Sequence, residues 1–576
     1  MRTLKNRMLF KFLFAILLLP FLSYSQEPGI HTNRVEDSEN EKPDDSYLPN
    51  AYANKKLSPA YRYDSRSHLN PGGTGIITHQ VNVDPGQQNI LGDAANEPNI
   101  AVNPLNENEI VIGWRQFDNV LSNFRQAGWA YSSDGGQTWT FPGSILPSVF
   151  QSDPVLDYDN SGNFYYNSLK SAAGPIFPCY VYKSINGGIS WNYGVYIGGG
   201  DKAWMTVDRS GGIGEGTIYS SWTSSTSDCL PGFFTRSTDG GTSFDSCSII
   251  PDDPSWAAEA VGNNGELYLA GRSPSTAAVR IVKSTDAQDS SQSASWSQVT
   301  TCNLGGFMTA YTTINPVGLT GQPCIDVDRS NGPGRDNVYV ACSVQPYFNS
   351  DVADVMFNKS TNGGATWNNA APAKINDDTD TTNTQWFGTL SVAPNGRIDV
   401  IWLDTRDTPG SDNSALYYSY SIDQGNTWSA NEKLSDIFDP HIGYPNQQKM
   451  GDYFDMVSNN TGVHLAWVNT LNGEQDVYYS FITPQTSTVI DEVSGNLNVS
   501  VHPNPTSGLV EISCHDKKKP IAIRVEIFTT VGKKLFSTPV FNTRHVIDIS
   551  SQPAGIYFLK LITDDGLETV KKIIRE

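Results

Sequence analysis

The sequence predicts an all-β protein: a seven-bladed β-propeller, with six blades as the alternative, followed by a small C-terminal β-sandwich. The first observation is composition, since the 576 residues are 11% aromatic, only 17% charged, and include 50 glycines. Such a composition favours short strands joined by tight turns over long helices. The second is an octapeptide that recurs along the chain, and the third is a pair of strand-like segments that precedes it.

The octapeptide has the form Ser-x-Asp/Asn-Gly-Gly-x-Thr-Trp and returns at intervals of roughly 50 to 75 residues, a period typical of propeller blades. Its Asp or Asn can accept hydrogen bonds from the backbone amides that follow, and its glycines permit positive φ angles. The final aromatic ring can then pack over the hairpin. Five good copies and a stretched sixth are Ser132–Trp139, Ser184–Trp191, Ser237–Phe244, Ser360–Trp367, Ser421–Trp428 and Ser284 to about Trp296.

Each unit begins with two strand-like segments that alternate apolar with polar or small residues, as half-buried strands do. This pattern gives seven units between about 97 and 483, the last without an octapeptide. The alternative count is six blades, which applies if one of the degraded units is an insertion. The strand-like segment near Ile77 can close the ring by completing the final blade. The inner strands are expected to begin at Glu97, Ser152, Lys202, Ser255, Pro323, Gln385 and Asp452.

The two ends of the chain differ from the repeat region. Residues 1–25 have a basic start and a short apolar run, which predicts a signal peptide, and the polar, acidic residues 26–70 predict a disordered leader. The propeller is expected over 71–485, a linker over 486–494 and a small β-domain over 495–576. No stretch reaches the roughly 20 apolar residues of a membrane helix, so no transmembrane segment is predicted.

Charge and cysteine content narrow the function classes. The net charge of -21 disfavours nucleic acid and anionic lipid as partners, because both require a basic surface. All seven cysteines lie in the exported part, where disulfides persist, and their spacing matches no zinc site. Cys229 and Cys247 flank one predicted hairpin and are the best candidates for a bridge, with seven buried thiols as the alternative.

Two resemblances follow from these motifs. The octapeptides resemble the Asp boxes, or BNR repeats, of sialidases and related propellers, among which are hydrolases, lyases and non-catalytic proteins. In those proteins the boxes lie on the blade periphery, away from the active site. The C-terminal segment resembles a type A sorting domain of the type IX secretion system of Bacteroidetes, through Val501–Gly508, Pro553–Leu561 and its basic end. It implies handling by that secretion machinery through the periplasm and outer membrane, removal of the domain, and release or cell-surface attachment.

Ligands of propellers are expected in the central funnel, where inner strands begin, so polar residues at those positions are candidates. Arginines near the ends of the middle strands can line the same rim. The structural alternative is that the acidic residues bind neighbouring backbones and that the arginines pair with surface carboxylates such as Asp404, which is common. The candidates are Glu97, Asp153, Asp201, Lys202, Glu259, Gln322, Gln385, Asp452 and Tyr453, with Arg115, Arg272 and Arg406.

The sialidase resemblance assigns roles to several of them. It implies that Arg115, Arg272 and Arg406 clamp a carboxylate, with Lys202, Asp201 and Gln385 as further substrate-binding residues. It also implies Tyr453 as a nucleophile activated by Glu259, and Asp118 as acid/base, since a neutral phenol can attack a carboxylate-bearing anomeric carbon with little repulsion. This chain departs from the pattern. It lacks the Arg-Ile-Pro motif, Asp118 follows Arg115 closely, and seven units are counted where sialidases have six.

The function predicted is that of a secreted glycan-processing propeller, a sialidase-like glycoside hydrolase acting on an extracellular glycan or polysaccharide. One alternative is a lyase on uronic-acid glycans, because His441, Tyr444 and Tyr453 fall in the last unit and Lys202 could neutralise a carboxylate. The other is a non-catalytic propeller that binds carbohydrate or protein through exposed aromatic rings. No cofactor or catalytic metal is predicted, although a structural calcium ion is compatible with Asp326, Asp328, Asp377, Asp378 and Asp380.

Overall fold

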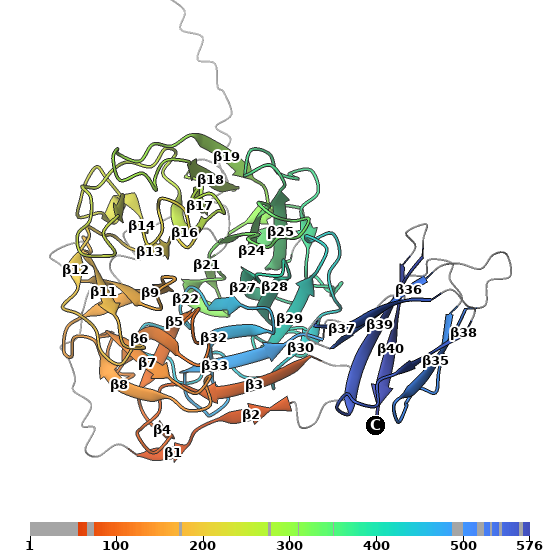
Figure 1. Cartoon of the computed structure of the whole chain (residues 1–576). Coiled ribbons are helices and arrows are strands. Elements are labelled where there is room, and N and C mark those ends of the chain that lie inside the picture. The colour runs from red at the N-terminus through yellow and green to blue at the C-terminus, as the bar shows by residue number, and fades with distance from the viewer. Residues whose placement is uncertain are drawn as a thin grey trace, which may run out of the picture. The chain divides into compact units, whose positions relative to one another are not determined.

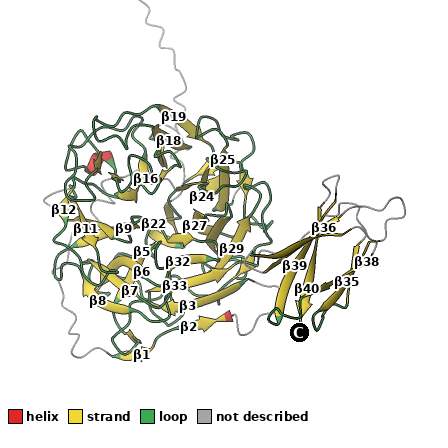
Figure 2. Cartoon of the chain, in the orientation of Figure 1, coloured by secondary structure: helices red, strands yellow, loops and turns green. Residues whose placement is uncertain are grey.

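The computed structural model describes residues 56–65, 74–171, 176–274, 278–308, 310–348, 351–485, 499–514, 523–529, 533–540, 544–563 and 568–576. These residues are strands, turns and loops, apart from short 3-10 turns such as Ser224–Thr226 (Figure 1, Figure 2). The chain divides into two compact units, of which the first ends at Pro484. The predicted signal peptide (1–25), most of the predicted leader and the linker 486–494 lie outside the described residues.

Seven antiparallel sheets of three or more strands follow one another in the described part of the first unit. The first four sheets are β5 (Ala94–Val102), β6 (Ile110–Phe117), β7 (Gln126–Ser132) and β8 (Thr140–Ser144); β9 (Gln151–Tyr158), β10 (Phe164–Lys170), β11 (Cys179–Ser184) and β12 (Val195–Tyr196); β13 (Trp204–Val207), β14 (Ile218–Ser221) and β15 (Phe234–Ser237); and β16 (Ser255–Val261), β17 (Leu267–Arg272), β18 (Val279–Ser284) and β19 (Gln298–Cys302). The strand-like segments predicted for these units are confirmed at their positions.

The remaining three sheets complete the series. They are β23 (Cys324–Val327), β24 (Val338–Pro346), β25 (Asp354–Ser360) and β26 (Ala373–Lys374), with β20 (Gly306–Phe307) beside β24; β27 (Gln385–Val392), β28 (Ile398–Asp404), β29 (Ala415–Ser421) and β30 (Glu432–Lys433); and β31 (Asp455–Ser458), β32 (Val463–Asn469), β33 (Asp476–Thr483), β3 (Gly75–Gln80) and β2 (Arg62–Asp64). Two further pairs are β1 (Leu57–Pro59) with β4 (Gln88–Ile90), and β21 (Ala310–Thr312) with β22 (Asn315–Leu319).

The first strands of the seven sheets, in chain order β5, β9, β13, β16, β23, β27 and β31, form a closed series. Each contacts the next, and β31 contacts β5. Figure 1 shows β5, β9, β16 and β27 of this series toward the middle of the unit, with β8, β12 and β19 at its rim. Each sheet therefore presents its first strand to a common axis and its last strand to the outside.

The chain closes this ring with its own N-terminal part. Strand β3 pairs antiparallel with β33 from Gly75 opposite Thr483 to Gln80 opposite Tyr478, which confirms the predicted role of the segment near Ile77. The leader predicted to be disordered as far as residue 70 differs from the structure at residues 57–59 and 62–64. These form β1 and β2, because an edge strand offers backbone hydrogen bonds to any extended segment whatever its side chains.

The octapeptides form one repeated turn. In the first copy, the amides of Gln137 and Thr138 donate to Asp134 Oδ1 at 2.9 and 3.0 Å, and the Gly136 amide donates to Ser132 Oγ at 2.9 Å. The stretched sixth copy keeps the same bonds across its insertion, since Asp286 Oδ1 accepts the amide of Ser295 at 2.8 Å. The turn chemistry predicted from the sequence is confirmed in both forms.

These turns also connect each sheet to the one before it. His79 Nδ1 lies 2.7 Å from the Gly136 carbonyl, Trp129 Nε1 donates to the Gly188 carbonyl at 2.9 Å, and Lys359 Nζ donates to the Gln424 carbonyl at 2.8 Å. Gly136 has φ +82°, and a Cβ added there would overlap the ring of Tyr479 in the preceding sheet. The octapeptides thus stabilise the packing between sheets.

We predict that Gly136→Ala destabilises the first unit more than Gly410→Ala does. Both glycines have positive φ, at +82° and +78°, but nothing lies within 4 Å of a Cβ at Gly410. Both variants should lose about 1 kcal/mol to backbone strain, whereas Gly136→Ala should lose about 1–3 kcal/mol more to overpacking. Urea unfolding of the two variants measures the difference, and equal midpoints would contradict this account of the octapeptide.

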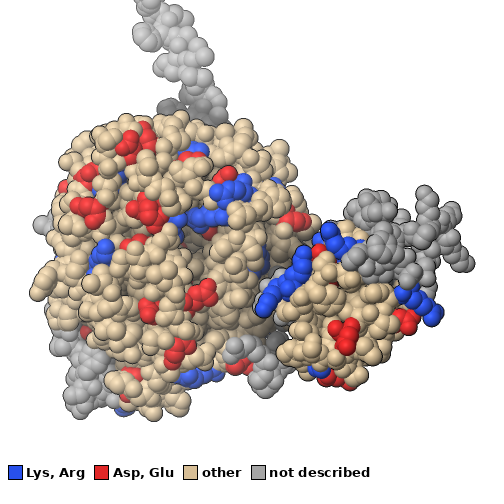
Figure 3. All heavy atoms as spheres, viewed as in Figure 1, with Lys and Arg blue, Asp and Glu red and all other residues tan. Residues whose placement is uncertain are grey.

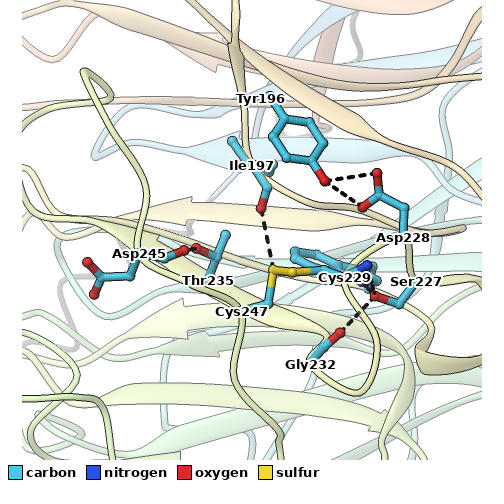
Figure 4. The surroundings of a disulfide bond; sticks show 10 residues. Tyr196, Ile197, Ser227, Asp228, Cys229, Gly232, Thr235, Asp245 and Cys247 are labelled. Atoms are coloured by element: carbon cyan, nitrogen blue, oxygen red, sulfur yellow. Dashed lines mark hydrogen bonds between the residues drawn. A yellow bond between two sulfur atoms is a disulfide. The ribbon is translucent and has the colours of Figure 1, made fainter.

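A disulfide strengthens the third sheet, which has three named strands. Cys229 and Cys247 are bonded, with their Cα atoms 6.2 Å apart, as predicted (Figure 4). The bond ties the loop after β14 to the segment after β15, where Ser248 forms an isolated bridge with Phe234. Cys179, Cys302, Cys324 and Cys342 are free thiols.

The second unit contains two antiparallel sheets. One has β34 (Val499–His502), β35 (Leu509–Cys514) and β38 (Arg544–Asp548), and the other has β37 (Lys534–Val540), β36 (Ile523–Thr529), β39 (Gly555–Thr563) and β40 (Glu568–Arg575). Val510, Ile512 and Ile547 from the first sheet share one buried apolar cluster with residues of the second. Burial of that common cluster holds the two sheets of this unit together.

Candidate functional site

Each first strand carries one residue with positive φ at or just before its N-terminal end. Among non-glycine residues this conformation is uncommon, and it persists where the surrounding structure enforces it. The antiparallel register is interrupted beside four of these positions, for example between Asn96 and Asn99. The residues and φ angles are Glu97 51°, Asp153 51°, Lys202 53°, Trp256 54°, Gly321 151°, Phe387 56° and Gly451 99°.

Five charged side chains near these ends form a continuous chain of ion pairs, which we call the charge cluster. Its members, in order of contact, are Arg115, Glu97, Lys449, Asp452 and Lys202. Arg115 Nε lies 3.2 Å from Glu97 Oε2, and Lys449 Nζ lies 3.2 Å from Glu97 Oε1. Asp452 Oδ2 lies 2.8 Å from Lys449 Nζ and 2.6 Å from Lys202 Nζ. Positive and negative charges therefore alternate along the cluster.

The charge cluster is buried, since its side chains are at most 4% exposed. Burial raises the pKa of Glu97 to about 7, against the opposing effect of Arg115 and Lys449. Burial alone would also raise the pKa of Asp452, but Lys202 and Lys449 hold it well below its ordinary value. The cluster is thus held together by mutual neutralisation, and breaking one pair would leave a charge buried and uncompensated.

A hairpin formed by β21 and β22 is bonded to the same segment of chain. The Leu319 amide donates to Asp452 Oδ1 at 2.9 Å, and Asn315 Nδ2 donates to the Gly451 carbonyl at 2.8 Å. At the turn of this hairpin, the Thr313 carbonyl lies 2.8 Å from His441 Nε2. Figure 1 shows β22 in the middle of the ring. The hairpin contributes to excluding solvent from the charge cluster.

Tyr453 lies next to the charge cluster but is engaged by the backbone. Its hydroxyl donates to the Pro154 carbonyl at 2.8 Å, and its ring meets Trp204 edge to face at 5.4 Å. Burial raises the pKa of Tyr453 well above 10, and Glu97 and Asp153 add to the rise. A phenol in this environment stays neutral, and its hydroxyl keeps its proton while donating a hydrogen bond to the Pro154 carbonyl.

The three arginines predicted to act together have different partners in three different sheets. Arg115 belongs to the charge cluster. Arg272 lies over the ring of Trp256, with its Cζ 5.4 Å from the centroid. Arg406 lies 2.6 Å from Asp377 and 2.8 Å from Asp404. The structure thus brings one of the three to the charge cluster, while the clamp itself stays a prediction.

The other predicted residues are divided between the charge cluster and separate networks. Asp201 lies 3.9 Å from Lys202 Nζ, at the charge cluster. Gln385 donates to Asp404 Oδ1 at 3.2 Å, in the network of Arg406, and Asp118 accepts Gln126 Nε2 at 2.8 Å. Of the residues considered for calcium, Asp326 pairs with Arg329 at 3.0 Å. In the described part of the chain, no group of three His, Cys, Asp or Glu side chains is arranged to hold a metal ion.

A cavity of about 310 Å³ lies among the seven first strands, and we call it the axial cavity. Exposed residues at the C-terminal ends of these strands, such as Pro104, Asn160 and Pro394, lie at its mouth, while Tyr453 and Phe387 line it near the opposite ends. Every first strand contributes to its wall. One lining residue from each strand is Ile100, Val155, Met205, Ala260, Ile325, Leu390 and Met456.

Three side chains of neighbouring segments give the axial cavity its polar and aromatic character. Both carboxylate oxygens of Glu259 and both amide atoms of Gln322 are buried. No described group meets the Gln322 amide in hydrogen-bonding geometry, while Ser221 is the hydrogen-bonding neighbour of the Glu259 carboxyl. Trp204, which is half-buried, lines the same cavity. Burial raises the pKa of Glu259 to about 8, although Ser221 opposes the rise. Glu259 is therefore largely protonated at neutral pH.

The remaining charges of the axial cavity have structural partners. Asp157 accepts the Val207 amide at 2.7 Å and Arg209 Nη1 at 2.5 Å, and Asp326 accepts the Val392 amide at 2.8 Å and pairs with Arg329. Asp455 accepts the Ile100 amide at 3.0 Å, and burial raises its pKa to about 7. These carboxylates join β9 to β13, β23 to β27 and β31 to β5.

Sequence reasoning missed Trp204, Lys449, Asp157 and Asp455. Trp204 and the two aspartates lie within apolar strand segments, where they resemble core residues, and Lys449 lies in an irregular segment before β31. A usable signal was the recurrence of an acidic residue near the end of three first strands, at Asp157, Asp326 and Asp455. A carboxylate inside a buried strand requires a partner, and here the partner is the neighbouring strand.

We predict that Glu259→Gln makes folding less sensitive to pH. The pKa of Glu259 is about 8 in the folded chain and has a model-peptide value of 4.5. Between these values the folded state binds more protons than the unfolded state, so the free energy of unfolding falls as pH rises. In the variant, the free energy of unfolding should fall less steeply with pH, by up to about 1.4 kcal/mol per pH unit. Near pH 8 the variant should therefore be more stable than the wild type.

Urea titrations over a series of pH values measure this slope. Glu215→Gln, at an exposed position between β13 and β14, is the matched control and should keep the wild-type slope. A Glu259→Gln protein whose unfolding depends on pH as strongly as the wild type would show that Glu259 is ionised in the folded chain.

Comparison with known proteins identifies the C-terminal part. Residues 500–576 match the family described as secretion system C-terminal sorting domain. The sorting domain belongs to the type IX secretion system and indicates export, with the protein secreted or attached to the cell surface. No helix within the described residues has the length and apolar content needed to cross a membrane. No curated protein matches the chain.

Solved structures similar to the chain include a sialidase and an α-L-arabinofuranosidase. A protein of unknown function from Dyadobacter fermentans has 14% identity and a TM-score of 0.40, with 71% of this chain and 98% of that chain covered. A Hadza microbial sialidase has 13% identity and a TM-score of 0.37, covering 68% and 66%. An α-L-arabinofuranosidase of Fusarium graminearum has 12% identity and a TM-score of 0.38, covering 68% and 93%. Similarities at this level do not identify an activity for this chain.

Proposed function

We propose that this chain is an exported glycan-binding propeller whose ligand enters the axial cavity. The observation that carries the proposal is the group formed by Trp204, Glu259 and Gln322 in that cavity. An indole face stacks on the apolar face of a sugar ring, while a carboxyl and an amide exchange hydrogen bonds with its hydroxyls. A volume of about 310 Å³ is at the lower end of the range for small-molecule pockets.

The domain arrangement is part of the same proposal. The closed series of seven first strands supports a seven-bladed propeller over residues 71–485, with β3 completing the last blade. The apolar cluster shared by two sheets supports a β-sandwich for the sorting domain over 495–576. A signal peptide at 1–25, a leader over 26–70 and a linker at 486–494 would complete the exported chain.

Binding has more support than the sialidase-like mechanism. That mechanism needs three arginines around one carboxylate and a tyrosine close to an ionised base. Arg115, Arg272 and Arg406 have separate partners, and the Tyr453 hydroxyl donates to a backbone carbonyl. Uronate lyase chemistry has less support as well, because His441 contacts the hairpin and is not part of the axial cavity lining.

A glycoside hydrolase of another kind is the second candidate, favoured by two carboxyl groups in the axial cavity. Glu259, with a pKa of about 8, could donate a proton, and Asp455, with a pKa of about 7, could act as the base. Glycosidases commonly use two carboxyl groups whose pKa values differ. This candidate uses the same cavity, so one experiment tests both.

We predict that Trp204→Leu and Glu259→Ala each weaken glycan binding by about tenfold, because each removes roughly 1.4 kcal/mol of contact. A glycan array probed with the full exported chain would identify ligands, and calorimetry on the best ligand would measure the loss. Trp296→Leu is the control, since Trp296 contacts Phe234 in the outer part of the third sheet and should leave affinity unchanged.

Two outcomes separate the candidates. Ligand recovered intact after long incubation supports binding, whereas shortened products that disappear in Glu259→Gln establish the hydrolase. An array with no bound glycan, or binding that survives both cavity variants, overturns the placement of the ligand in the axial cavity.

A further inference from the structure

We propose that the ligand of the axial cavity is an uncharged saccharide and that the cavity rejects sugars bearing a carboxylate. This inference rests on the proposed function, since it specifies what the same cavity binds. It departs from the sialidase and uronate lyase hypotheses, both of which require an anionic sugar.

The first argument is that the cavity has no cation available for a carboxylate. Its lining contains two arginines, Arg209 and Arg329, and no lysine. Arg209 Nη1 is bound to Asp157 Oδ1 at 2.5 Å and to the Tyr158 carbonyl at 2.9 Å. Arg329 donates to Asp326 at 3.0 Å and to the Val261 carbonyl at 3.1 Å. Both cations are therefore already neutralised and oriented by the protein.

An anionic sugar would have to displace one of these aspartates. Asp157 also accepts the Val207 amide, and Asp326 accepts the Val392 amide, so each carboxylate joins two first strands. Displacement would leave a carboxylate without its cation at a strand junction, which is costly in a partly buried site. The charge cluster holds three more cations, but Lys202, Lys449 and Arg115 all pair with carboxylates there.

The second argument is that the polar groups still able to bind are neutral or acidic. Glu259 and Asp455 line the cavity and are not members of any of its ion pairs with arginine, so a bound anion would face carboxyl groups instead of a cation. Asp455 is partly ionised near neutral pH and would repel a bound carboxylate, while the protonated Glu259 offers no positive charge to offset the anion's lost hydration. An uncharged ligand avoids this repulsion.

The third argument is the match between the unsatisfied groups and sugar hydroxyls. A protonated Glu259 donates one hydrogen bond and accepts others, and Gln322 donates two and accepts others. A hydroxyl can both donate and accept, so it satisfies either group. Trp204 in β13, Glu259 in β16 and Gln322 just before β23 come from three consecutive sheets, and they form one continuous sector of the cavity wall.

The test compares saccharides that differ only by a carboxylate. Methyl glycosides of galactose, glucose and mannose are paired with those of the matching uronic acids. Binding to the full exported chain is measured by calorimetry. We expect at least one neutral sugar to bind and its carboxylated partner to bind at least tenfold more weakly.

Two variants connect the discrimination to the cavity acids. A Glu259→Gln, Asp455→Asn double variant should narrow the preference for the neutral partner by severalfold, because neither position can then carry a negative charge. Glu215→Gln, exposed and outside the cavity, should retain the wild-type preference. An unchanged preference in the double variant overturns the electrostatic explanation.

The results distinguish this inference from the proposed function. Equal binding of both partners, or preference for the carboxylated one, overturns the neutral-sugar inference and leaves glycan binding standing. Binding of no sugar in the whole panel and array overturns the proposed function, and the inference falls with it.

Discussion

Closure of the ring by β3 is the constraint on which the rest of the first unit depends. An N-terminal strand pairs with β33, the last strand of the repeat region, so the two ends of the unit are fixed to one sheet. With the ring closed, β31 contacts β5 and all seven first strands surround a common axis. The charge cluster joins residues in or just before three of the sheets, and the axial cavity is lined by all seven first strands, so neither could form within one sheet.

The axis is closed at one end and open at the other. Near the N-terminal ends of the first strands, five alternating charges neutralise one another and the β21–β22 hairpin is bonded to the same segment. At the C-terminal ends, exposed turn residues lie at the mouth of the axial cavity. Acidic and basic side chains are dispersed over the visible face of the first unit (Figure 3), so its net negative charge is not concentrated in one patch there. The axial cavity is therefore the feature best suited to bind a small ligand.

Much of the fold could be predicted because its signals are local. The octapeptide turn depends on residues within one segment, such as Ser132, Asp134 and Gly136, and the strands depend on alternation over a few residues. The bridge between Cys229 and Cys247 was accessible for the same reason. The strands at 57–59 and 62–64 were not, because they form by pairing with β4 and β3, and pairing of backbones leaves little trace in the sequence.

The site was predicted less completely because its partners are distant in sequence. Glu97, Lys202 and Asp452 were recognised as polar residues at strand starts, but their ion pairs join segments that are hundreds of residues apart along the chain. Positive φ angles at Glu97, Lys202 and Gly451 set chain directions that strand alternation does not predict. Trp204 was not singled out from the sequence, since nothing local distinguishes a ring that lines a cavity from one that fills it.

The central claim is that a saccharide occupies the axial cavity, and a crystal structure of the exported chain soaked with its best glycan ligand tests it most directly. The account predicts density for a sugar ring against Trp204, with hydroxyls within hydrogen-bonding distance of Glu259 and Gln322. Density at the outer turns of the octapeptides, with no sugar in the axial cavity, would contradict it.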